Sequence, residues 1–368
     1  MLENLRKVSK HWWYQVAHTT LGMGVYQFVA LASGILIARG LGPAQQGRFQ
    51  LLMSIIVFTV GLAKLGLDEG VAYAIPQYRV NNSPKVRGLI VYSIGITLLI
   101  SLGMGGLFWA AANFLETSVF GVKGFAYDLS NMIGLLPAWM LLVMGMGVLR
   151  GLGRSDLRAY IYYYIVGISF LGIVLVLSVS SLTLANTYLA RMGSYLLGAM
   201  IALLMIFRIV PAGNWRVTWV DARRLHSLAG LLVFVGLFQF LVEQPLIDMF
   251  LVGRYASAVE LGIYSVAARI AVLVAIIANS VAIVLAPMFS ESVTRQNFAQ
   301  MKRHYRHSAE WMAAISLFVG GSLILLCEQI LGLFGRSYQT GSSILVVLLI
   351  GQICVGILGP NSPLLLAN

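Results

Sequence analysis

The stretch EQPLIDMFLVGRYASAVELGIYSVAARIAVLVAIIANSVAIVLAPMF, residues 243–289, decides the fold, because it joins two long apolar runs through a short polar connection. The first run covers residues 227–251 and the second covers residues 261–289. Each run is long enough to cross ~30 Å of hydrocarbon as a helix. The stretch therefore predicts two neighbouring, antiparallel membrane helices.

These two runs carry ionisable residues at matching depths. Glu243 lies eight residues before Leu251, and Arg269 lies eight residues after Leu261, so both would lie ~12 Å below the same membrane face. Asp248 is shallower and is the alternative partner of Arg269. An ionised side chain in lipid costs at least ~2.5 kcal/mol, so such residues normally face a bundle interior or a water-filled cavity. Either these residues form a structural tie between two helices, or Arg269 receives an anionic head group, whose phosphate oxygens a guanidinium binds bidentately.

The composition supports a membrane protein with many spans. Hydrophobic residues make up 59% of the 368 residues, charged residues make up 10%, and the mean hydropathy is +0.86. Soluble proteins have a charged share of ~25%. The two cysteines, Cys327 and Cys354, show no metal-ligand spacing, so neither a disulfide scaffold nor a metal site is expected.

The hydropathy pattern predicts an all-α, polytopic membrane protein with about ten transmembrane helices. The runs cover roughly 19–38, 49–75, 88–114, 131–149, 159–179, 186–207, 227–251, 261–289, 309–326 and 342–360. Residues 1–18 are basic and aromatic and suit a helix at the level of the lipid headgroups.

A weak internal repeat predicts two pseudo-repeated lobes around a central cavity. ARGLGPAQQGRF (residues 38–49) precedes the second span, and VGRYASAVELGIY (residues 252–264) occupies the matching position before the eighth. Six spans separate the copies, so the lobes should share one orientation. The prediction is a six-helix lobe over residues 1–210, including the interfacial segment, and an incomplete lobe with four helices over residues 211–368.

Positive charge is distributed unequally between the two sides of the predicted membrane. The N-terminal tail and alternate connections hold 17 Lys and Arg residues, and the other connections hold 5. This bias predicts an inner (cytoplasmic) membrane protein with its N-terminus in the cytoplasm. The net charge of +12 is therefore explained by short membrane-flanking loops, and a nucleic-acid partner is not expected.

The second span contains a further charged group within LAKLGLDEGVAYAIPQY. Lys64 and Asp68 are one helical turn apart on one face, and Glu69 follows directly. Two interpretations remain open: an internal ion pair near the cytoplasmic end of a long helix, or a protonatable or cation-binding group that biases which way the cavity opens.

Three further features concern helix packing and the cavity. Arg191, ~7 Å from the outer face, either extends to the headgroups or contributes to the cavity. Arg39, at the end of the first span, is another candidate for binding substrate in the cavity. Gly147 and Gly151 have the small-xxx-small spacing that allows two helices to approach closely.

Several motifs are missing from the sequence. There is no GxxxxGK[ST] loop for ATP, no HExxH, and no arguable Ser/His/Asp or Cys/His set. The longest outer connection, roughly residues 115–130, is too short to house the catalytic loop of a glycan polymerase or ligase. We therefore expect a protein that is not an enzyme, that uses no cofactor, and that draws on an ion gradient, the membrane potential or the substrate's own gradient.

Six motifs resemble one known family in their order and spacing. They are ILIARGLGPAQQGRFQL (35–51), LGLDEGVAYAIPQY (65–78), VLRGLGRSDLRAY (148–160), PLIDMFLVGRYASAVELGIYSVAARIAVL (245–273), LAPMFSES (285–292) and ILGLFGRSYQTGSSIL (330–345). The chain resembles the lipid-linked oligosaccharide flippases, the O-antigen and polysaccharide transporters of the multidrug/oligosaccharidyl-lipid/polysaccharide exporter (MOP) superfamily.

The resemblance implies two six-helix lobes that open alternately and move a polyprenyl-diphosphate-linked glycan outward. It implies that Arg269 is similar to a cavity arginine that meets the diphosphate, and that Asp248 is similar to the family's acid near the end of the seventh span. Members usually have twelve to fourteen spans, so ten suggest a fragment. The expected partners are lipid-linked oligosaccharide, membrane lipids and glycosyltransferase or polymerase enzymes. The alternatives are a cation-coupled multidrug or small-molecule exporter and a non-transporting membrane partner of glycan-assembly enzymes.

Overall fold

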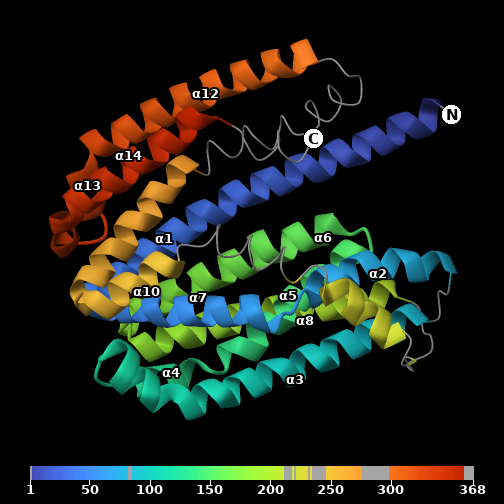
Figure 1. Ribbon diagram of the computed structural model, residues 1–368, viewed down its shortest axis with the longest axis horizontal. Coiled ribbons are helices and arrows are strands. Elements are labelled where there is room, and N and C mark those ends of the chain that lie inside the picture. Colours follow the sequence, from blue (N-terminus) through green and yellow to red (C-terminus); the bar gives the residue numbers. More distant parts are fainter. Residues whose placement is uncertain are drawn as a thin grey trace. The chain divides into compact units, whose positions relative to one another are not determined.

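The computed structural model describes residues 2–81, 85–210, 218, 221–230, 233, 246–275 and 298–359, and these ranges contain helices and no strand (Figure 1). The chain forms two compact units. The first contains Met1–Leu41 and Arg48–Ala256, and the second contains Gly42–Gly47 and Ser257–Asn368. The predicted all-α, two-lobed fold is confirmed. The lobe boundary predicted at residue 210 stays a prediction.

The first unit contains the longer series of helices. They are α1 (Leu2–Ala63), α2 (Leu67–Asn81), α3 (Lys85–Phe114) with the π-helix η1 (Leu115–Phe120), α4 (Phe125–Met132), α5 (Leu135–Gly151), α6 (Ser155–Ala159), the π-helix η2 (Tyr160–Val166), α7 (Gly167–Ser180), α8 (Leu184–Ile209), a helix over 221–230, and α10 (Leu246–Tyr255).

In the second unit, α12 packs along α14. Its helices are a helix over Ala258–Ala275, α12 (Phe298–Leu325), α13 (Cys327–Gly332), the 3-10 helix η3 (Arg336–Gly341) and α14 (Ser342–Leu358). A reciprocal cap starts the first of them: Ser257 Oγ accepts the Glu260 N–H at 3.2 Å, and Glu260 Oε2 accepts the Ser257 N–H at 2.8 Å.

Eight helices of the described residues are long and apolar enough to cross a membrane. The first of these segments, Leu21–Val80, has 60 residues and contains the kink and the break described below. At ~1.5 Å per residue it is about three times as long as the hydrocarbon core is thick, so it has room for two of the predicted spans. The predicted run 227–251 lies partly outside the described residues. With eight candidate spans in the described part of the chain, the protein is a multi-pass membrane protein.

The short loop expected between the first two spans is a helix kink instead. The helix α1 continues through residues 38–49 and departs from helical geometry at Gly42 (φ 70°, ψ 170°). Only glycine adopts such a conformation at low cost, and Pro43 is preset for the first position of the following helical segment. These two residues replace the expected loop.

The second predicted span is broken where a continuous helix was expected. The helix α1 ends at Ala63, and α2 begins at Leu67. Leu65 (φ 46°) and Gly66 (φ 68°) between them are left-handed. A Cβ at Gly66 would lie 2.5 Å from the carbonyl oxygen of Ala229, so glycine also permits close backbone approach to the helix over 221–230.

The helix α5 lies against α2, α3 and α8 in the core of the first unit. A Cβ at Gly147 would lie 2.6 Å from the Asp68 carbonyl oxygen, and a Cβ at Gly151 would lie 3.1 Å from Ala72. The close helix approach predicted from the glycine spacing is confirmed, and it occurs against α2.

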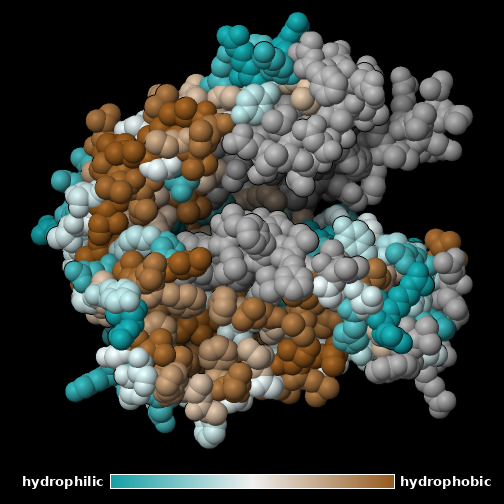
Figure 2. All heavy atoms as spheres, in the orientation of Figure 1, coloured by the Kyte–Doolittle hydropathy of each residue, from teal (hydrophilic) through white to brown (hydrophobic). Residues whose placement is uncertain are grey.

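The face of the first unit that is seen in Figure 2 carries many apolar residues. On α3, for example, Leu99, Leu102 and Trp109 are exposed by 67%, 62% and 67%. Soluble monomers rarely expose contiguous apolar patches of more than a few hundred Å². This surface suits contact with acyl chains.

Candidate functional site

A charged cavity of about 420 Å³ lies inside the first unit. It is bounded by the break between α1 and α2, by α5, and by the segment from α6 to η2. Its polar and aromatic lining consists of Lys64, Asp68, Glu69, Trp139, Arg150, Ser155, Arg158, Tyr162 and Tyr163. A site for water or a polar ligand inside a membrane bundle has this kind of lining.

The break between α1 and α2 positions the acids of the cavity. Asp68 and Glu69 lie in the first turn of α2, where the partial positive charge of the helix N-terminus favours carboxylates. Lys64 Nζ lies 3.2 Å from Asp68 Oδ2. Discontinuous helices of this kind form substrate and ion sites in other transporters.

Asp68 retains unused hydrogen-bonding capacity. The residue is 8% exposed, and within the described part of the chain its Oδ1 atom has no hydrogen-bond partner. A buried acceptor without a partner is costly unless water, a proton or a ligand satisfies it. Because Asp68 also lines the cavity, this oxygen is available to whatever occupies it.

A second ion pair joins α2 to α5 across the cavity. Arg150 Nη2 lies 2.6 Å from Glu69 Oε2, and each side chain is 33% exposed. Partly exposed pairs contribute little net stability, because their charges are screened. Arg150 and Glu69 can therefore exchange partners with a charged ligand at small cost.

Arg158 gives the cavity its excess of positive charge. The residue is exposed, lies on α6, and forms no ion pair with any described residue. The lining thus holds three cationic side chains and two acids. The arrangement favours an anion over a cation.

A π-helix supplies the aromatic wall. The segment η2 includes Tyr162 and Tyr163, both of which line the cavity. Tyr26 of α1 stacks on Tyr162, with the ring centroids 5.4 Å apart. Short π-helical segments are rare and occur frequently at functional sites. The extra residue per turn changes the direction in which the tyrosines point.

Arg191 packs among aromatic rings inside the first unit. Its guanidinium carbon lies 3.5 Å from the centroid of the Phe170 ring and 5.7 Å from that of Tyr195. Its Nε atom is buried and has no hydrogen-bond partner among the described residues. This cation–π packing differs from the predicted alternative in which the Arg191 side chain extends to the lipid headgroups. Arg191 does not line the cavity described above, and a contact with substrate stays a prediction.

The other predicted site residues lie elsewhere. Glu243 is outside the described residues. Asp248, in α10, and Arg269, in the helix Ala258–Ala275, are half-buried and belong to different compact units, so their pairing stays a prediction. Arg269 lies close enough to Tyr338 to interact electrostatically. Arg39 is exposed on α1.

The sequence prediction missed the α5–α6 contribution to this cavity. Arg150 and Arg158 both occur in VLRGLGRSDLRAY, which the charge pattern assigns to a cytoplasmic connection. Hydropathy cannot show that this connection folds back onto the acids of α2. The described residues contain no group of three or more His, Cys, Asp or Glu side chains that could hold a metal ion.

The fold of this chain is similar to that of solved membrane transporters of the MOP superfamily. The chain is similar to an inward-facing multidrug resistance MATE family transporter (TM-score 0.70, 16% identity, covering 96% of this chain and 87% of that one). It is also similar to an outward-facing form of a MATE transporter (TM-score 0.59, 18% identity, 95% and 83%). A third is a MOP superfamily transporter from Pyrococcus furiosus, described as having a binding pocket of reverse polarity (TM-score 0.59, 16% identity, 95% and 83%).

The family is defined by the sequence. The model of the polysaccharide biosynthesis protein family matches residues 13–293, and the MatE model matches residues 232–365. The chain belongs to the polysaccharide biosynthesis protein family, which confirms the resemblance predicted from its motifs. No curated protein matches the sequence.

Proposed function

We propose that this protein flips a polyprenyl-diphosphate-linked oligosaccharide from the cytoplasmic to the outer leaflet by alternating access. The product would serve cell-surface polysaccharide biosynthesis, such as that of the O-antigen of lipopolysaccharide. The protein would lie in the inner membrane with its N-terminus in the cytoplasm. It would break no covalent bond and so would not be an enzyme.

The observation that carries this proposal is the lining of the first-unit cavity, in a chain of the polysaccharide biosynthesis family. Arg158 is exposed and forms no ion pair with a described residue. Lys64 and Arg150 are paired with Asp68 and Glu69, and a diphosphate can displace these acids. Guanidinium groups bind phosphate oxygens bidentately. Trp139 and Tyr162 offer flat faces beside these charges.

The predicted site residues have roles in this proposal. Arg269 receives the diphosphate, and Glu243 and Asp248 keep Arg269 oriented while the site is empty. Arg191 and Arg39 contribute positive charge to the path of the head group. Lys64, Asp68 and Glu69 respond to ion binding or protonation and bias the direction in which the cavity opens. Glycosyltransferases would supply the substrate, and a glycan polymerase would accept the product.

The test is glycan flipping in vesicles that contain the purified protein and a lipid-linked oligosaccharide. We expect Arg158→Ala and Arg269→Ala to leave the glycan on the leaflet to which it was added. Arg303→Ala is the matched control, because Arg303 is an exposed arginine on α12 and does not line the cavity. Flipping by Arg158→Ala as fast as by Arg303→Ala would contradict the proposed role of the cavity, and flipping by Arg269→Ala at that same rate would contradict the proposed role of Arg269.

A cation-coupled multidrug or small-molecule exporter is the second candidate. The MatE match over residues 232–365 and the fold of the MATE transporters favour it. Loss of the protein would then change drug tolerance and leave surface glycan intact. A non-transporting partner of glycan-assembly enzymes would alter glycan assembly in cells and give no flipping in vesicles of the purified protein.

A further inference from the structure

An apolar groove of about 260 Å³ runs along the surface of the first unit, where α8 packs on α5. Leu141 of α5 forms one side. The other side is a stripe of α8 that consists of Leu196, Ala199, Met200, Leu203, Leu204 and Phe207. These residues recur every three or four positions, so they share one face of the helix. Met200 and Leu204 are exposed by 54% and 56%, so the groove is open to its surroundings.

The length of the groove matches one leaflet of the bilayer. Leu196 and Phe207 are eleven positions apart, which corresponds to ~17 Å at ~1.5 Å per residue. The hydrocarbon core is ~30 Å thick, so one leaflet contributes ~15 Å. The helix α8 ends at Ile209, and the connection after it is one of the basic connections that are predicted to be cytoplasmic. The groove therefore extends from about the middle of the membrane to its predicted cytoplasmic surface.

Two arginines lie at the cytoplasmic end of the groove. The guanidinium carbon of Arg87, on α3, lies 5.6 Å from the centroid of the Phe207 ring, the last residue of the stripe. Arg208 is exposed in the last turn of α8. It follows Leu204 by four positions, so it continues the face of the stripe. The apolar groove thus ends at two positive charges.

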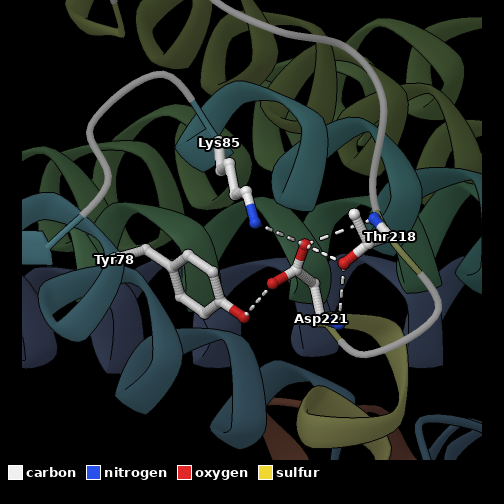
Figure 3. Close-up of polar contacts among 4 residues, drawn as sticks. All are labelled: Tyr78, Lys85, Thr218 and Asp221. Atoms are coloured by element: carbon white, nitrogen blue, oxygen red, sulfur yellow. Dashed lines mark hydrogen bonds and ion pairs between the residues drawn. The ribbon is translucent and has the colours of Figure 1, made fainter.

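The neighbouring Lys85 belongs to a separate cluster. Figure 3 shows its Nζ atom directed at the Asp221 carboxylate, 3.2 Å from Oδ2. Asp221 begins the helix over 221–230, and its Oδ1 accepts a hydrogen bond from the hydroxyl of Tyr78, near the end of α2, at 2.8 Å. Its Oδ2 also accepts from the Thr218 N–H at 3.2 Å and from the Thr218 hydroxyl at 2.6 Å.

This cluster keeps Lys85 engaged. Burial alone would raise the pKa of Asp221, but the hydrogen bonds from Thr218, Tyr78 and Lys85 outweigh it and lower the pKa to about 2. The carboxylate is therefore ionised at physiological pH and neutralises Lys85. The positive charge at the end of the groove consequently comes from the two arginines.

We propose that this groove is a binding site for an anionic phospholipid of the cytoplasmic leaflet. One acyl chain lies along the α8 stripe, and the phosphate contacts Arg87 and Arg208. Guanidinium groups bind phosphate oxygens bidentately, and basic pockets between membrane helices on the cytoplasmic side bind anionic headgroups. A headgroup with a net negative charge is favoured over a zwitterionic one, because the groups that flank it are cations.

The dimensions of the groove select this occupant. The methyl-branched polyprenyl chain of a glycan carrier extends beyond one leaflet, whereas a phospholipid acyl chain spans one leaflet. All residues of the site belong to the first unit, so the site does not depend on how the two units are placed. The inference is also independent of glycan flipping.

The experiment measures lipid binding directly. The protein is purified in a nonionic detergent and titrated with phosphatidylglycerol, or with zwitterionic phosphatidylcholine that has the same acyl chains. Native mass spectrometry counts the bound lipids. We expect the first phosphatidylglycerol to bind roughly 25-fold more tightly than the first phosphatidylcholine, because each arginine near the membrane surface strengthens the binding of an anionic lipid roughly fivefold. Equal affinities for the two lipids would overturn the proposal.

Removal of the arginines tests the phosphate contact. Arg87→Gln and Arg208→Gln should each weaken the binding of phosphatidylglycerol roughly fivefold and leave that of phosphatidylcholine unchanged. Arg208 is exposed, so Arg208→Gln keeps the test valid if Arg87→Gln does not fold. Arg303→Gln is the matched control, because Arg303 is exposed on α12 and does not line the groove. Wild-type affinity for phosphatidylglycerol in both groove variants would overturn the proposal.

Filling the groove tests the position of the acyl chain. Leu204→Trp places an indole ring in the groove. Leu102→Trp is the matched control, because Leu102 is exposed on α3 and does not line the groove. We expect Leu204→Trp to abolish the first binding event and Leu102→Trp to preserve it. Unchanged binding by Leu204→Trp would overturn the proposed site.

Two other occupants would give different results. If a polyprenyl phosphate displaces most of the bound phosphatidylglycerol when added at an equal concentration, the groove belongs to a glycan carrier. If the wild type forms a dimer that phosphatidylglycerol leaves intact and that Leu204→Trp dissociates, a second copy of the chain covers the groove. Either result would overturn the proposal, and neither depends on whether the protein flips a glycan.

Discussion

The two ends of α2 carry charged clusters of opposite character. At the first end, Asp68 faces a cavity with one oxygen that no described residue satisfies, and Glu69 shares a half-exposed pair with Arg150. At the far end, both oxygens of the Asp221 carboxylate are satisfied. An unsatisfied buried acceptor retains capacity for a ligand, whereas a satisfied one fixes the position of helices. One helix therefore connects a proposed binding site to a contact that holds neighbouring helices together.

The largest expected effect comes from the unsatisfied end. Asp68→Asn removes the negative charge that pairs with Lys64 and replaces one carboxylate oxygen with an amide group. Because we propose that this acid biases the direction in which the cavity opens, we expect flipping to slow more than ~100-fold, which corresponds to about 2.7 kcal/mol in the free-energy barrier. The measurement is flipping in vesicles, normalised to the amount of folded protein.

The double variant Lys64→Met/Asp68→Asn is the control for an unpaired lysine. If charge imbalance alone causes the defect, the double variant will recover most of the activity. We expect it to remain slow, because the negative charge of Asp68 is still missing. A normal rate with Asp68→Asn alone would remove the distinction between the two ends.

Close packing of α2 on α5 should produce the next largest effect. In Gly147→Ala the new Cβ would lie 2.6 Å from the Asp68 carbonyl oxygen, and overpacking of this kind costs about 1–3 kcal/mol. Gly103→Ala on α3 is the matched control, because its Cβ would meet nothing within 4 Å. Thermal unfolding in detergent should show a lower midpoint for Gly147→Ala only. Equal midpoints would mean that α2 can shift away from α5.

The pH dependence of the free energy of unfolding should identify the far end of α2, where both oxygens of Asp221 have hydrogen-bond partners. The pKa of Asp221 is lowered to about 2, below the ~3.9 of an unfolded aspartate, so its contribution is complete above pH ~4 and is lost as the pH falls toward 2. The contribution is about 2 kcal/mol. The unfolding midpoint of the wild type, relative to that of Asp221→Asn, should therefore decrease between pH 4 and pH 2. Parallel curves for the two proteins would contradict this assignment.

The smallest effect is expected from Glu69→Gln. The pair of Glu69 with Arg150 is 33% exposed on each side, so its loss should change the free energy of unfolding by less than ~1 kcal/mol. Chemical denaturation is the measurement. A larger loss would show that the cavity is drier than the exposure of the Glu69 and Arg150 side chains indicates. The charged groups at both ends of α2 would then stabilise the fold.

The sequence predicted some parts of this picture and not others. The four-residue spacing of Lys64 and Asp68 anticipated their ion pair, and the spacing of Gly147 and Gly151 anticipated close packing, because both patterns depend only on helix geometry. The predicted continuous second span was wrong, since the break at Leu65 and Gly66 accommodates Ala229, which is distant in sequence. The Arg150–Glu69 pair and the Asp221 cluster were missed for the same reason.

By itself, the sequence determined the class of this protein: long apolar runs must form helices in lipid because no water is present to satisfy their backbone groups. Its motifs also determined the family. Only the tertiary structure decided which charges meet. It brought Arg150 and Arg158 from a basic connection to the acids of α2, and it brought Asp221 to Tyr78 and Lys85. Such pairings join residues more than sixty positions apart, and they depend on how helices pack rather than on the periodicity of any single helix.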